Sequence, residues 1–308
     1  MLSRRTIVGW IAVGLGTLVT CLWAFWGIVE NFHEGWHYGS LAKNLGLMVI
    51  QYMSPMLISM GLALIAIRWS RIGGGLYVLL GLLFSVFIFR TRSNLTLGVV
   101  MSWLPVTGGL VLIGVLFRLG RRKRRQLAYA VAVGLPLLVV LIAGIRPAFR
   151  VAGRVDDENR EARLVEGNGV RLIWAPAGPG WERSTRGPTW EQARKRCLYL
   201  TEDGKSLAEE AQGIWRLPTV DEAVRCMSRH GRNCGGVWNA EKEHAAYDLP
   251  PDKESPLWDT TSPVIYWWTD SEKDDGRAYR IVYDGGVWSS PKTLRMGSLG
   301  FRAVKPAP

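Results

Sequence analysis

The residues with the clearest potential for chemistry form the string His-Glu-Gly-Trp-His at positions 33–37, which matches the H-E-x-x-H pattern. On a helix, this spacing places two imidazoles on one face, where they can hold zinc, beside a glutamate that acts as a general base. The context does not favour a zinc site. Gly35 is a weak helix former, and the other two histidines, which could supply a further ligand, lie far along the chain. The string therefore favours an interfacial loop without a metal. A metal-dependent enzyme built on His33, Glu34 and His37 is the alternative.

A second candidate for chemistry is the pair Cys226 and Cys234, at the start of a segment rich in Gly, Asn and Pro. In an oxidising compartment outside the cytoplasm, this pair can form a disulfide. The alternative is that Cys226 packs as a small apolar residue and Cys234 is a loop thiol, since Cys197 leaves an odd number of cysteines in this half. No C-x-x-C spacing occurs, so neither a zinc ribbon nor a thioredoxin motif is indicated.

The elements that position these residues differ between the two halves of the chain. Residues 1–150 contain 15 Lys and Arg against two acidic residues, whereas residues 151–308 contain 23 Lys and Arg against 24 acidic residues. The net charge of +12 therefore belongs to the first half, and no basic patch is expected to dominate the second. This distribution argues against nucleic acid as a partner.

The first half contains five apolar runs without Asp, Glu, Lys or Arg, at residues 7–29, 45–67, 73–89, 95–117 and 127–145. Four of them reach the ~20 residues that a helix needs to cross ~30 Å of hydrocarbon, and the third is near the lower limit. Residues 1–145 are therefore predicted to form a five-helix transmembrane domain in the lipid bilayer. The third run is the weak point, because only four spans remain if it does not cross.

The basic residues between these runs predict the orientation of the chain. With the N-terminus in the cytoplasm, the cytoplasmic segments carry ten Lys and Arg, six of them within residues 118–125, and the opposite segments carry five. Short segments rich in Lys and Arg stay in the cytoplasm. The sequence thus predicts an inner-membrane protein with a cytoplasmic N-terminus and a C-terminal domain in the periplasm or outside the cell.

The second half begins with a charged segment, residues 146–168, whose low apolar content predicts a linker or a short exposed helix. A folded domain is expected over residues 169–306. Its first element is an alternating strand at residues 170–175, which Pro176 and a Gly-Pro-Gly sequence close.

Two capping boxes predict helices in this domain, because Thr189 precedes Gln192 and Thr219 precedes Glu222 by three residues. Asp284-Gly285-Gly286 predicts a hairpin between two later strands. The strands of the C-terminal part are expected at residues 264–269, 278–283, 287–290 and 301–304.

The order of these motifs resembles a known family. Trp215-Arg216-Leu217-Pro218-Thr219 together with Gly300-Phe301-Arg302 is a fairly specific pair of motifs. It resembles the C-terminal domain of collagen-like adhesins, which is related to the formylglycine-generating enzymes (sulfatase-modifying factors) and to C-type lectins. The resemblance covers about residues 168–306, implies an α+β, C-type-lectin-like fold, and does not include the membrane half. Arg302, on the final strand, is expected to tie the two ends of the domain together through hydrogen bonds.

The same resemblance argues against catalysis. The formylglycine-generating enzymes use a cysteine pair near the C-terminus, and residues 288–295 contain no cysteine. Non-enzymatic members of this fold are commonly binding or scaffold modules. The resemblance therefore implies neither an enzyme nor a cofactor.

Tryptophans near the strand ends are candidate ligand contacts. Neighbouring residues on a strand face opposite ways, so either Trp267 or Trp268 points away from the core unless another element covers it. An exposed tryptophan beside Asp270 and Arg295, with Trp288 nearby, can stack on a sugar or anchor a peptide. The alternative is that the long preceding loop covers both Trp267 and Trp268.

The sequence thus predicts an α-helical multi-pass membrane bundle joined to an α+β, C-type-lectin-like soluble domain. The expected function is membrane-anchored, non-enzymatic binding or sensing of a glycan, a peptide or a partner protein. The alternatives are the metal-dependent enzyme at the membrane surface and a structural subunit of a larger membrane complex.

Overall fold

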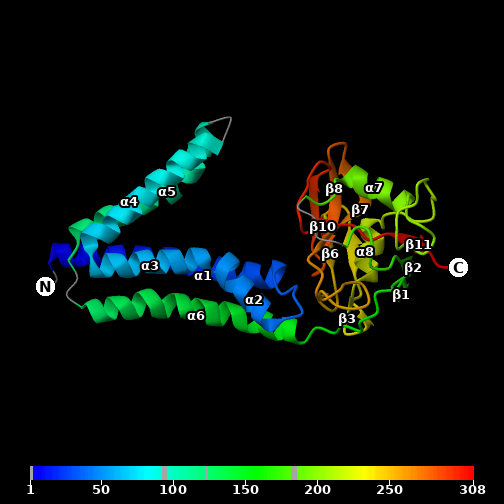
Figure 1. Cartoon of the computed structure of the whole chain (residues 1–308), viewed down its shortest axis with the longest axis horizontal. Helices are drawn as coiled ribbons and strands as arrows, with labels where there is room; N and C mark the ends of the chain where they lie inside the picture. Colours follow the sequence, from blue (N-terminus) through cyan, green and yellow to red (C-terminus); the bar gives the residue numbers. More distant parts are fainter. Residues whose placement is uncertain (1–2, 92–95, 122–123, 182–185) are drawn as a thin grey trace. The chain divides into compact units, whose positions relative to one another are not determined.

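The computed structural model describes residues 3–91, 96–121, 124–181 and 186–308. The chain divides into two compact units, the first comprising Met1–Gly35 and Leu41–Phe149, the second Trp36–Ser40 and Arg150–Pro308. The first unit is helical, and the second contains the β-strands of the described chain (Figure 1). The composition of the sequence changes near the same place, around residue 146.

Long apolar helices form the first unit. The helices that are long and apolar enough to cross a membrane are α1 (Arg4–Glu34), α4 (Ser70–Thr91), α5 (Leu97–Leu119) and α6 (Arg125–Ala152). A further candidate is a pair bent by 57°, made of α2 (Leu41–Leu47) with the π-helix η1 (Met48–Tyr52), and α3 (Ser54–Arg68). The described chain therefore has four candidate spans, or five if the bent pair crosses as one.

The irregular span is the second apolar run and not the third. The third run lies inside the 22-residue helix α4, which is long enough to cross a bilayer. The second run is interrupted at Met53, whose backbone N–H bonds to the carbonyl of Met48 in the wider π-helical spacing. Pro55 follows in the first turn of α3, where proline is accommodated because its missing N–H is not needed. This break is where the predicted five-span count remains open.

Three segments of the first unit meet at one end: the start of α1, the junction of α3 and α4, and the residues that follow α5 (Figure 1). The backbone N–H of Arg121 donates to the carbonyl of Arg5 at 2.8 Å. Gly9 permits this close approach, because a Cβ atom there would lie 2.5 Å from the carbonyl oxygen of Arg121. Helices α1, α4 and α6 therefore all begin at the same end.

The second unit is an α+β fold with two principal sheets. One sheet has the order β1-β2-β11 and consists of β1 (Arg163–Gly167), β2 (Val170–Trp174) and β11 (Val304–Pro306). The other has the order β10-β7-β8-β9 and consists of β7 (Tyr266–Asp274), β8 (Arg277–Val282), β9 (Val287–Pro291) and β10 (Leu299–Gly300). Because β2 lies between β1 and β11, the end of the chain pairs with the start of the unit.

Two short hairpins occupy the long irregular segment between α8 and β7. They are β3 (Ser228–Arg229) with β4 (Arg232–Asn233), and β5 (Val237–Asn239) with β6 (His244–Ala246). The hairpin predicted at Asp284-Gly285-Gly286 is confirmed, because β8 and β9 pair antiparallel and the N–H of Val282 donates to the carbonyl of Gly286 at 2.8 Å. Gly285 has φ +87°, a conformation that glycine adopts without strain.

Both predicted capping boxes are confirmed. Helix α7 (Trp190–Leu198) is capped by Thr189 with Gln192, and helix α8 (Val220–Cys226) by Thr219 with Glu222. In α8 the threonine hydroxyl accepts from the N–H of Glu222 at 3.2 Å, and the glutamate carboxylate accepts from the N–H of Thr219 at 2.8 Å. The local sequence alone thus fixes where the two helices of the second unit begin.

Replacing Thr219 with alanine is expected to destabilise the second unit by about 1 kcal/mol, because the first turn of α8 loses its hydroxyl acceptor. The measurement is chemical unfolding of the purified full-length protein, followed by tryptophan fluorescence. Thr293→Ala, at an exposed position in the turn after β9, is the matched control and should change the free energy of unfolding by less than ~0.5 kcal/mol. Equal effects of the two substitutions would contradict the capping role.

The segment predicted as a linker, residues 146–168, is largely regular or docked structure. Helix α6 continues to Ala152 and β1 begins at Arg163. Between them the side-chain oxygens of Asp156, Asp157 and Asn159 each accept from the backbone N–H two residues further on, at 2.9, 3.1 and 2.9 Å. These successive Asx turns fold the chain locally, so the charged residues shape the segment and do not mark it as a free tether.

Candidate functional site

The two tryptophans of β7 predicted as candidate ligand contacts are both buried, Trp267 with 2% of its surface exposed and Trp268 with 0%. Trp258, from the long loop, stacks on Trp267 with 3.5 Å between ring centroids and 5° between the ring planes. Trp268 donates its indole N–H to the carbonyl of Pro188 at 3.0 Å. Other elements therefore cover both rings, and neither can contact a ligand.

Arg302 lies among these tryptophans in the core of the second unit, with 2% of its surface exposed. The carbon at the centre of its guanidinium lies 4.5 Å from the ring of Trp181, 5.7 Å from that of Trp267 and 5.8 Å from that of Trp174. The faces of aromatic rings attract cations, and the attraction is stronger where water is excluded. The rings partly replace the water that the guanidinium has lost.

The guanidinium of Arg302 is also held by backbone carbonyls. Its Nε donates to Ala175 at 2.9 Å, and a terminal nitrogen donates to Pro256 at 3.2 Å and to Leu257. Ala175 directly follows β2, so the prediction that Arg302 ties the two ends of the domain together is confirmed. Burial, with a smaller contribution from the positive charges of Arg163 and Arg160, lowers the pKa of Arg302 to about 9.

The other residues of the two fold motifs are structural as well. Trp215, Leu217 and Phe301 are buried in the core, and Trp215 donates its indole N–H to the carbonyl of Thr201 at 2.9 Å. The backbone of Arg216 exchanges hydrogen bonds of 3.0 and 2.8 Å with Val304 at the start of β11. The motif residues thus position the closing strand and are not a ligand site.

Of the remaining candidate ligand contacts, one is exposed and two form contacts within the unit. Trp288 lies on the edge strand β9 with 59% of its surface exposed. Asp270 forms an ion pair of 2.9 Å with Arg194 of α7. Arg295 donates to the carbonyl of Gly187 at 3.2 Å. Trp288 is therefore the candidate that keeps an open ring, while the two charged candidates serve internal contacts.

The disulfide considered for Cys226 and Cys234 is not formed, and both thiols are free and buried. Burial raises the pKa of Cys226 to about 12 and outweighs the opposing effect of Trp174. Burial also raises the pKa of Cys234 to about 11, and the carboxylate of Glu254 adds to that effect. The two thiols thus respond to different neighbours. Cys226 packs as a small apolar residue, which is the alternative that the sequence offered.

The H-E-x-x-H string does not form the helical arrangement that a zinc site needs. Helix α1 ends at Glu34, Gly35 is extended with ψ −160°, and Trp36 has φ +55°. His37 therefore lies beyond the helix, and the i to i+4 spacing does not place two imidazoles on one helical face. Within the described ranges, no group of three His, Cys, Asp or Glu is placed to hold a metal ion.

A buried ionic cluster joins the start of the second unit to the loop before β7. Asp252, 2% exposed, pairs with Arg150 at 2.6 Å and with Arg154 at 3.0 Å. Burial opposes ionisation of Asp252, but Arg154 and Arg150 outweigh it and hold the pKa of this carboxyl below its usual value. The carboxylate of Glu254 accepts from the backbone N–H of Val155 at 2.8 Å. The cluster holds residues 150–155 against the domain.

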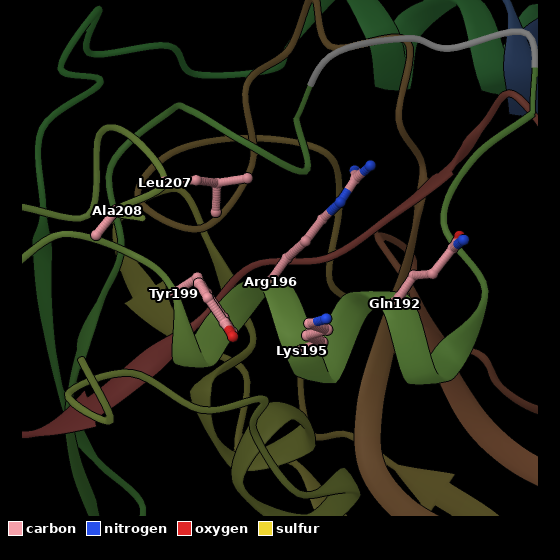
Figure 2. A pocket seen from close by; sticks show the side chains of 6 residues that line it. All are labelled: Gln192, Lys195, Arg196, Tyr199, Leu207 and Ala208. Atoms are coloured by element: carbon pink, nitrogen blue, oxygen red, sulfur yellow. The ribbon is translucent and has the colours of Figure 1, made fainter. Parts of the chain in front are cut away.

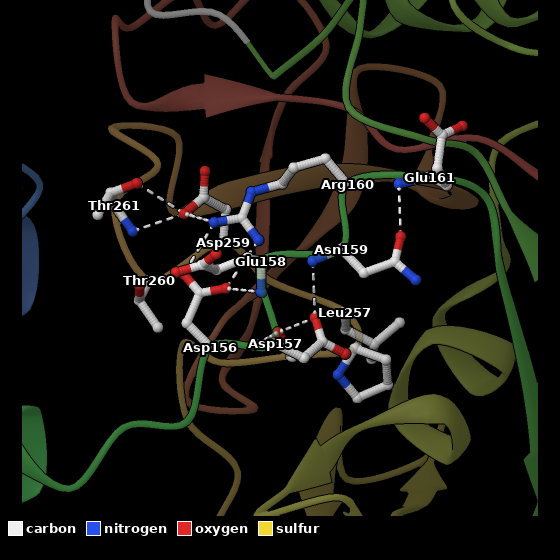
Figure 3. Close-up of polar contacts among 12 residues, drawn as sticks. Asp156, Asp157, Glu158, Asn159, Arg160, Glu161, Leu257, Asp259, Thr260 and Thr261 are labelled. Carbon is white, nitrogen blue, oxygen red and sulfur yellow. Dashed lines mark hydrogen bonds and ion pairs between the residues drawn. The ribbon is translucent and has the colours of Figure 1, made fainter.

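A second, half-buried set of polar contacts joins residues 156–160 to the loop before β7 (Figure 3). Arg160 bridges two carboxylates, Asp156 at 2.8 Å and Asp259 at 3.0 Å. The hydroxyl of Thr260 donates to Asp156 at 2.7 Å. The hydrogen bonds from Arg160 hold the pKa of Asp156 well below its usual range. These acids are engaged by donors from the chain itself, so they form a structural clasp.

Lys253, between the two acids of the buried cluster, is 1% exposed, and its ammonium nitrogen has no hydrogen-bond partner among the described residues. Burial lowers the pKa of Lys253 to about 7, Arg154 acts in the same direction, and Asp259 and Asp252 oppose it. The amine is therefore enclosed in the core, and its charged form is less stable there than in water.

The described surface of the second unit is hollowed beside α7, with a volume of about 330 Å³. We call this cavity the α7 hollow. Its lining residues are Gln192, Lys195, Arg196, Tyr199, Leu207 and Ala208 (Figure 2). The first four belong to α7 and its C-cap, and the last two to the loop that returns along the helix. The N–H of Ala208 donates to the carbonyl of Tyr199 at 2.7 Å, which fixes the loop against the helix end.

The α7 hollow combines positive charge with apolar surface. Lys195 and Arg196 are exposed, and neither forms an ion pair with any residue in the described parts of the chain. The ammonium of Lys195 lies 5.6 Å from the ring centre of Tyr199, and Leu207 is 46% exposed. Two free cations beside a phenol ring and a leucine suit a ligand that carries a carboxylate and an apolar group.

The sequence analysis did not identify the α7 hollow. Its residues come from a helix and a loop that are separated along the chain, and a run such as Arg194-Lys195-Arg196 on a helix is most often solvated surface. The one available signal was that Leu198 and Leu207 are large apolar residues close to a run of charged residues. Both are exposed in the structure, at 45% and 46%.

Comparisons with family models, with curated proteins and with solved structures found no match to this chain.

Proposed function

We propose that this protein is a membrane-anchored, non-enzymatic binding module that displays a C-type-lectin-like unit outside the cytoplasm. The α7 hollow is the contact site, and the ligand is a peptide or protein segment with a carboxylate beside an apolar side chain. The observation that carries the proposal is the pair Lys195 and Arg196, two exposed cations at a concave surface that have no ionic partner among the described residues.

The remaining features of the second unit support a binding role without chemistry. The thiols of Cys226 and Cys234 have pKa values raised to about 12 and about 11, so they are protonated and poorly nucleophilic at neutral pH. The two capped helices, followed by the β7–β10 sheet and the closing strand β11, support the C-type-lectin-like assignment.

The orientation in the membrane is supported by the arrangement of the first unit. Helices α1, α4 and α6 begin at the end where the arginines gather. Positively charged ends stay in the cytoplasm, so the N-terminus is cytoplasmic and α6 leads the chain away from that side. A reporter enzyme that is active only in the periplasm, fused after Pro308, should be active. Activity of a cytoplasmic reporter alone would contradict this orientation.

The binding proposal is tested with full-length protein in lipid nanodiscs on arrays of acidic and neutral peptides, with a glycan array in parallel. Peptides that combine a carboxylate with a leucine or an aromatic residue are expected to bind. Replacing both Lys195 and Arg196 with alanine should weaken binding about tenfold at low salt, because each exposed charge contributes up to ~1 kcal/mol. Raising the salt concentration should also weaken the binding of acidic peptides to the wild-type protein, because salt screens the exposed charges.

The matched control is Arg232→Ala with Lys242→Ala, which removes the same charge from exposed positions of the second unit outside the α7 hollow. This double variant should bind the acidic peptides as the wild type does. An equal loss in both double variants would mean that only net charge attracts the peptide. Binding confined to glycans and insensitive to Lys195 and Arg196 would overturn the proposed site and ligand.

A further inference from the structure

Eight arginines of the first unit lie at the ends of its helices and are all exposed, and we call this set the basic end. They are Arg4, Arg5, Arg68, Arg71, Arg118, Arg121, Arg124 and Arg125. The first two begin α1, the next two flank the junction of α3 and α4, and the last four lie close to the end of α5 or the start of α6. Figure 1 shows these three segments at one end of the helices.

Direct contacts hold the three segments together. The N–H of Arg121 donates to the carbonyl of Arg5 at 2.8 Å, which joins the end of α5 to the start of α1. Gly74, in the first turns of α4, faces the aliphatic part of Arg118, because a Cβ there would lie 2.6 Å from Cγ of that side chain. The positive charges of the basic end are therefore gathered by backbone packing and cannot simply separate.

No acidic residue balances the basic end. Residues 1–149 contain only Glu30 and Glu34, at the opposite end of the 31-residue helix α1. At 1.5 Å per residue, Glu30 lies roughly 37 Å along the helix from Arg5. None of the eight arginines forms an ion pair within the described ranges. Trp69 provides an aromatic contact, with its ring centre 5.6 Å from the guanidinium of Arg68.

We propose that the basic end binds the phosphate headgroups of anionic phospholipids, of the phosphatidylglycerol or cardiolipin type, in the cytoplasmic leaflet. This proposal rests on the membrane-spanning part of the proposed function and adds a lipid specificity to it. Apolar helices of the length of α4 and α5 place their ends at the level of the headgroups. Arginine forks bind phosphate in two-pronged geometry. Trp69, 53% exposed, is a residue suited to the same interface.

The experiment measures lipid retention by purified full-length protein in micelles that contain equal amounts of phosphatidylglycerol and phosphatidylcholine, by native mass spectrometry. The wild type is expected to retain phosphatidylglycerol in preference. Arg121→Gln, Arg124→Gln and Arg125→Gln in one chain should reduce that preference at least tenfold, since each basic residue near an anionic surface contributes about fivefold. Replacing the same three arginines with lysine should retain most of it, because the charge is kept.

The control variant combines Lys43→Gln, Arg90→Gln and Arg146→Gln, three exposed basic residues away from the basic end. It loses the same charge and should keep the preference for phosphatidylglycerol. Equal retention of the two lipids by the wild type, or equal losses in both glutamine variants, would overturn the proposal. Circular dichroism establishes that the variants are folded. The membrane orientation is measured separately by the reporter fused after Pro308, and peptide binding by the arrays, so failure of the lipid proposal can be told from failure of the proposed function.

Discussion

Replacing Arg302 with alanine is expected to destabilise the second unit by about 3 kcal/mol. The substitution removes the donor to Ala175, Pro256 and Leu257, and hydrogen bonds from a charged group contribute more than neutral ones. It also leaves a cavity among tryptophan rings, which cannot collapse freely. Relief of a buried charge opposes these losses, as the lowered pKa of Arg302 shows, but this side chain remains charged at neutral pH with its donors in use.

The measurement for Arg302 is thermal unfolding of full-length protein, followed by near-ultraviolet circular dichroism of the buried tryptophans. Arg302→Lys should give an intermediate loss, because it keeps the charge but not the planar fork. The matched control is Arg171→Ala, which removes an exposed arginine paired with Glu166 and should cost less than ~1 kcal/mol. A stability of Arg302→Ala equal to that of Arg171→Ala would contradict the assigned role.

Replacing Lys253 with methionine is expected to stabilise the second unit at pH 6 by on the order of 3 kcal/mol. The ammonium is buried without a hydrogen-bond partner in the described structure, and a methionine of similar length fills the same space without a charge. Most substitutions of a fully buried residue lower the free energy of unfolding, whereas Lys253→Met is expected to raise it.

The pH dependence of stability gives a second readout for Lys253. Its pKa is lowered to about 7 in the folded unit from 10.5, so between these values the unfolded chain binds more protons than the folded one. The free energy of unfolding of the wild type should therefore rise from pH 7 to pH 8, and that of Lys253→Met should not show this rise. Measurements stay below about pH 8, because Arg302, whose pKa is about 9, is already half-deprotonated at pH 9. A variant that is less stable than the wild type at pH 6 would refute the prediction.

The parts of the fold that follow from short-range rules could be predicted from the sequence. The capping boxes at Thr189 and Thr219 and the hairpin at Gly285 depend on residues within a few positions of each other. The break at Met53 could not be located, because apolar composition does not record hydrogen-bond spacing along a helix. The Asx turns of residues 156–161 were hidden for a similar reason, since charge alone does not reveal which donors will be near.

The candidate site was harder to predict than the fold. Arg302 was identified because the Gly300-Phe301-Arg302 motif places it next to the closing strand, and one of its three carbonyl partners, Ala175, directly follows β2. The burial of Trp267 and Trp268 depends on Trp258 and Pro188, which come from segments far away along the chain. The α7 hollow likewise depends on a loop that returns to the helix end. Long-range packing of this kind leaves little trace in sequence spacing.

The ionic cluster at Asp252 has a consequence for how this unit could be exchanged between proteins. Its partners Arg150 and Arg154 lie in the last turn of α6 and shortly after it, so the boundary of the second unit falls inside a helix whose central part is apolar. A gene fusion that begins at the first strand would leave a buried carboxylate without its cations. A recombination event that preserves the unit must therefore carry the final turn of the preceding helix with it, as one heritable module.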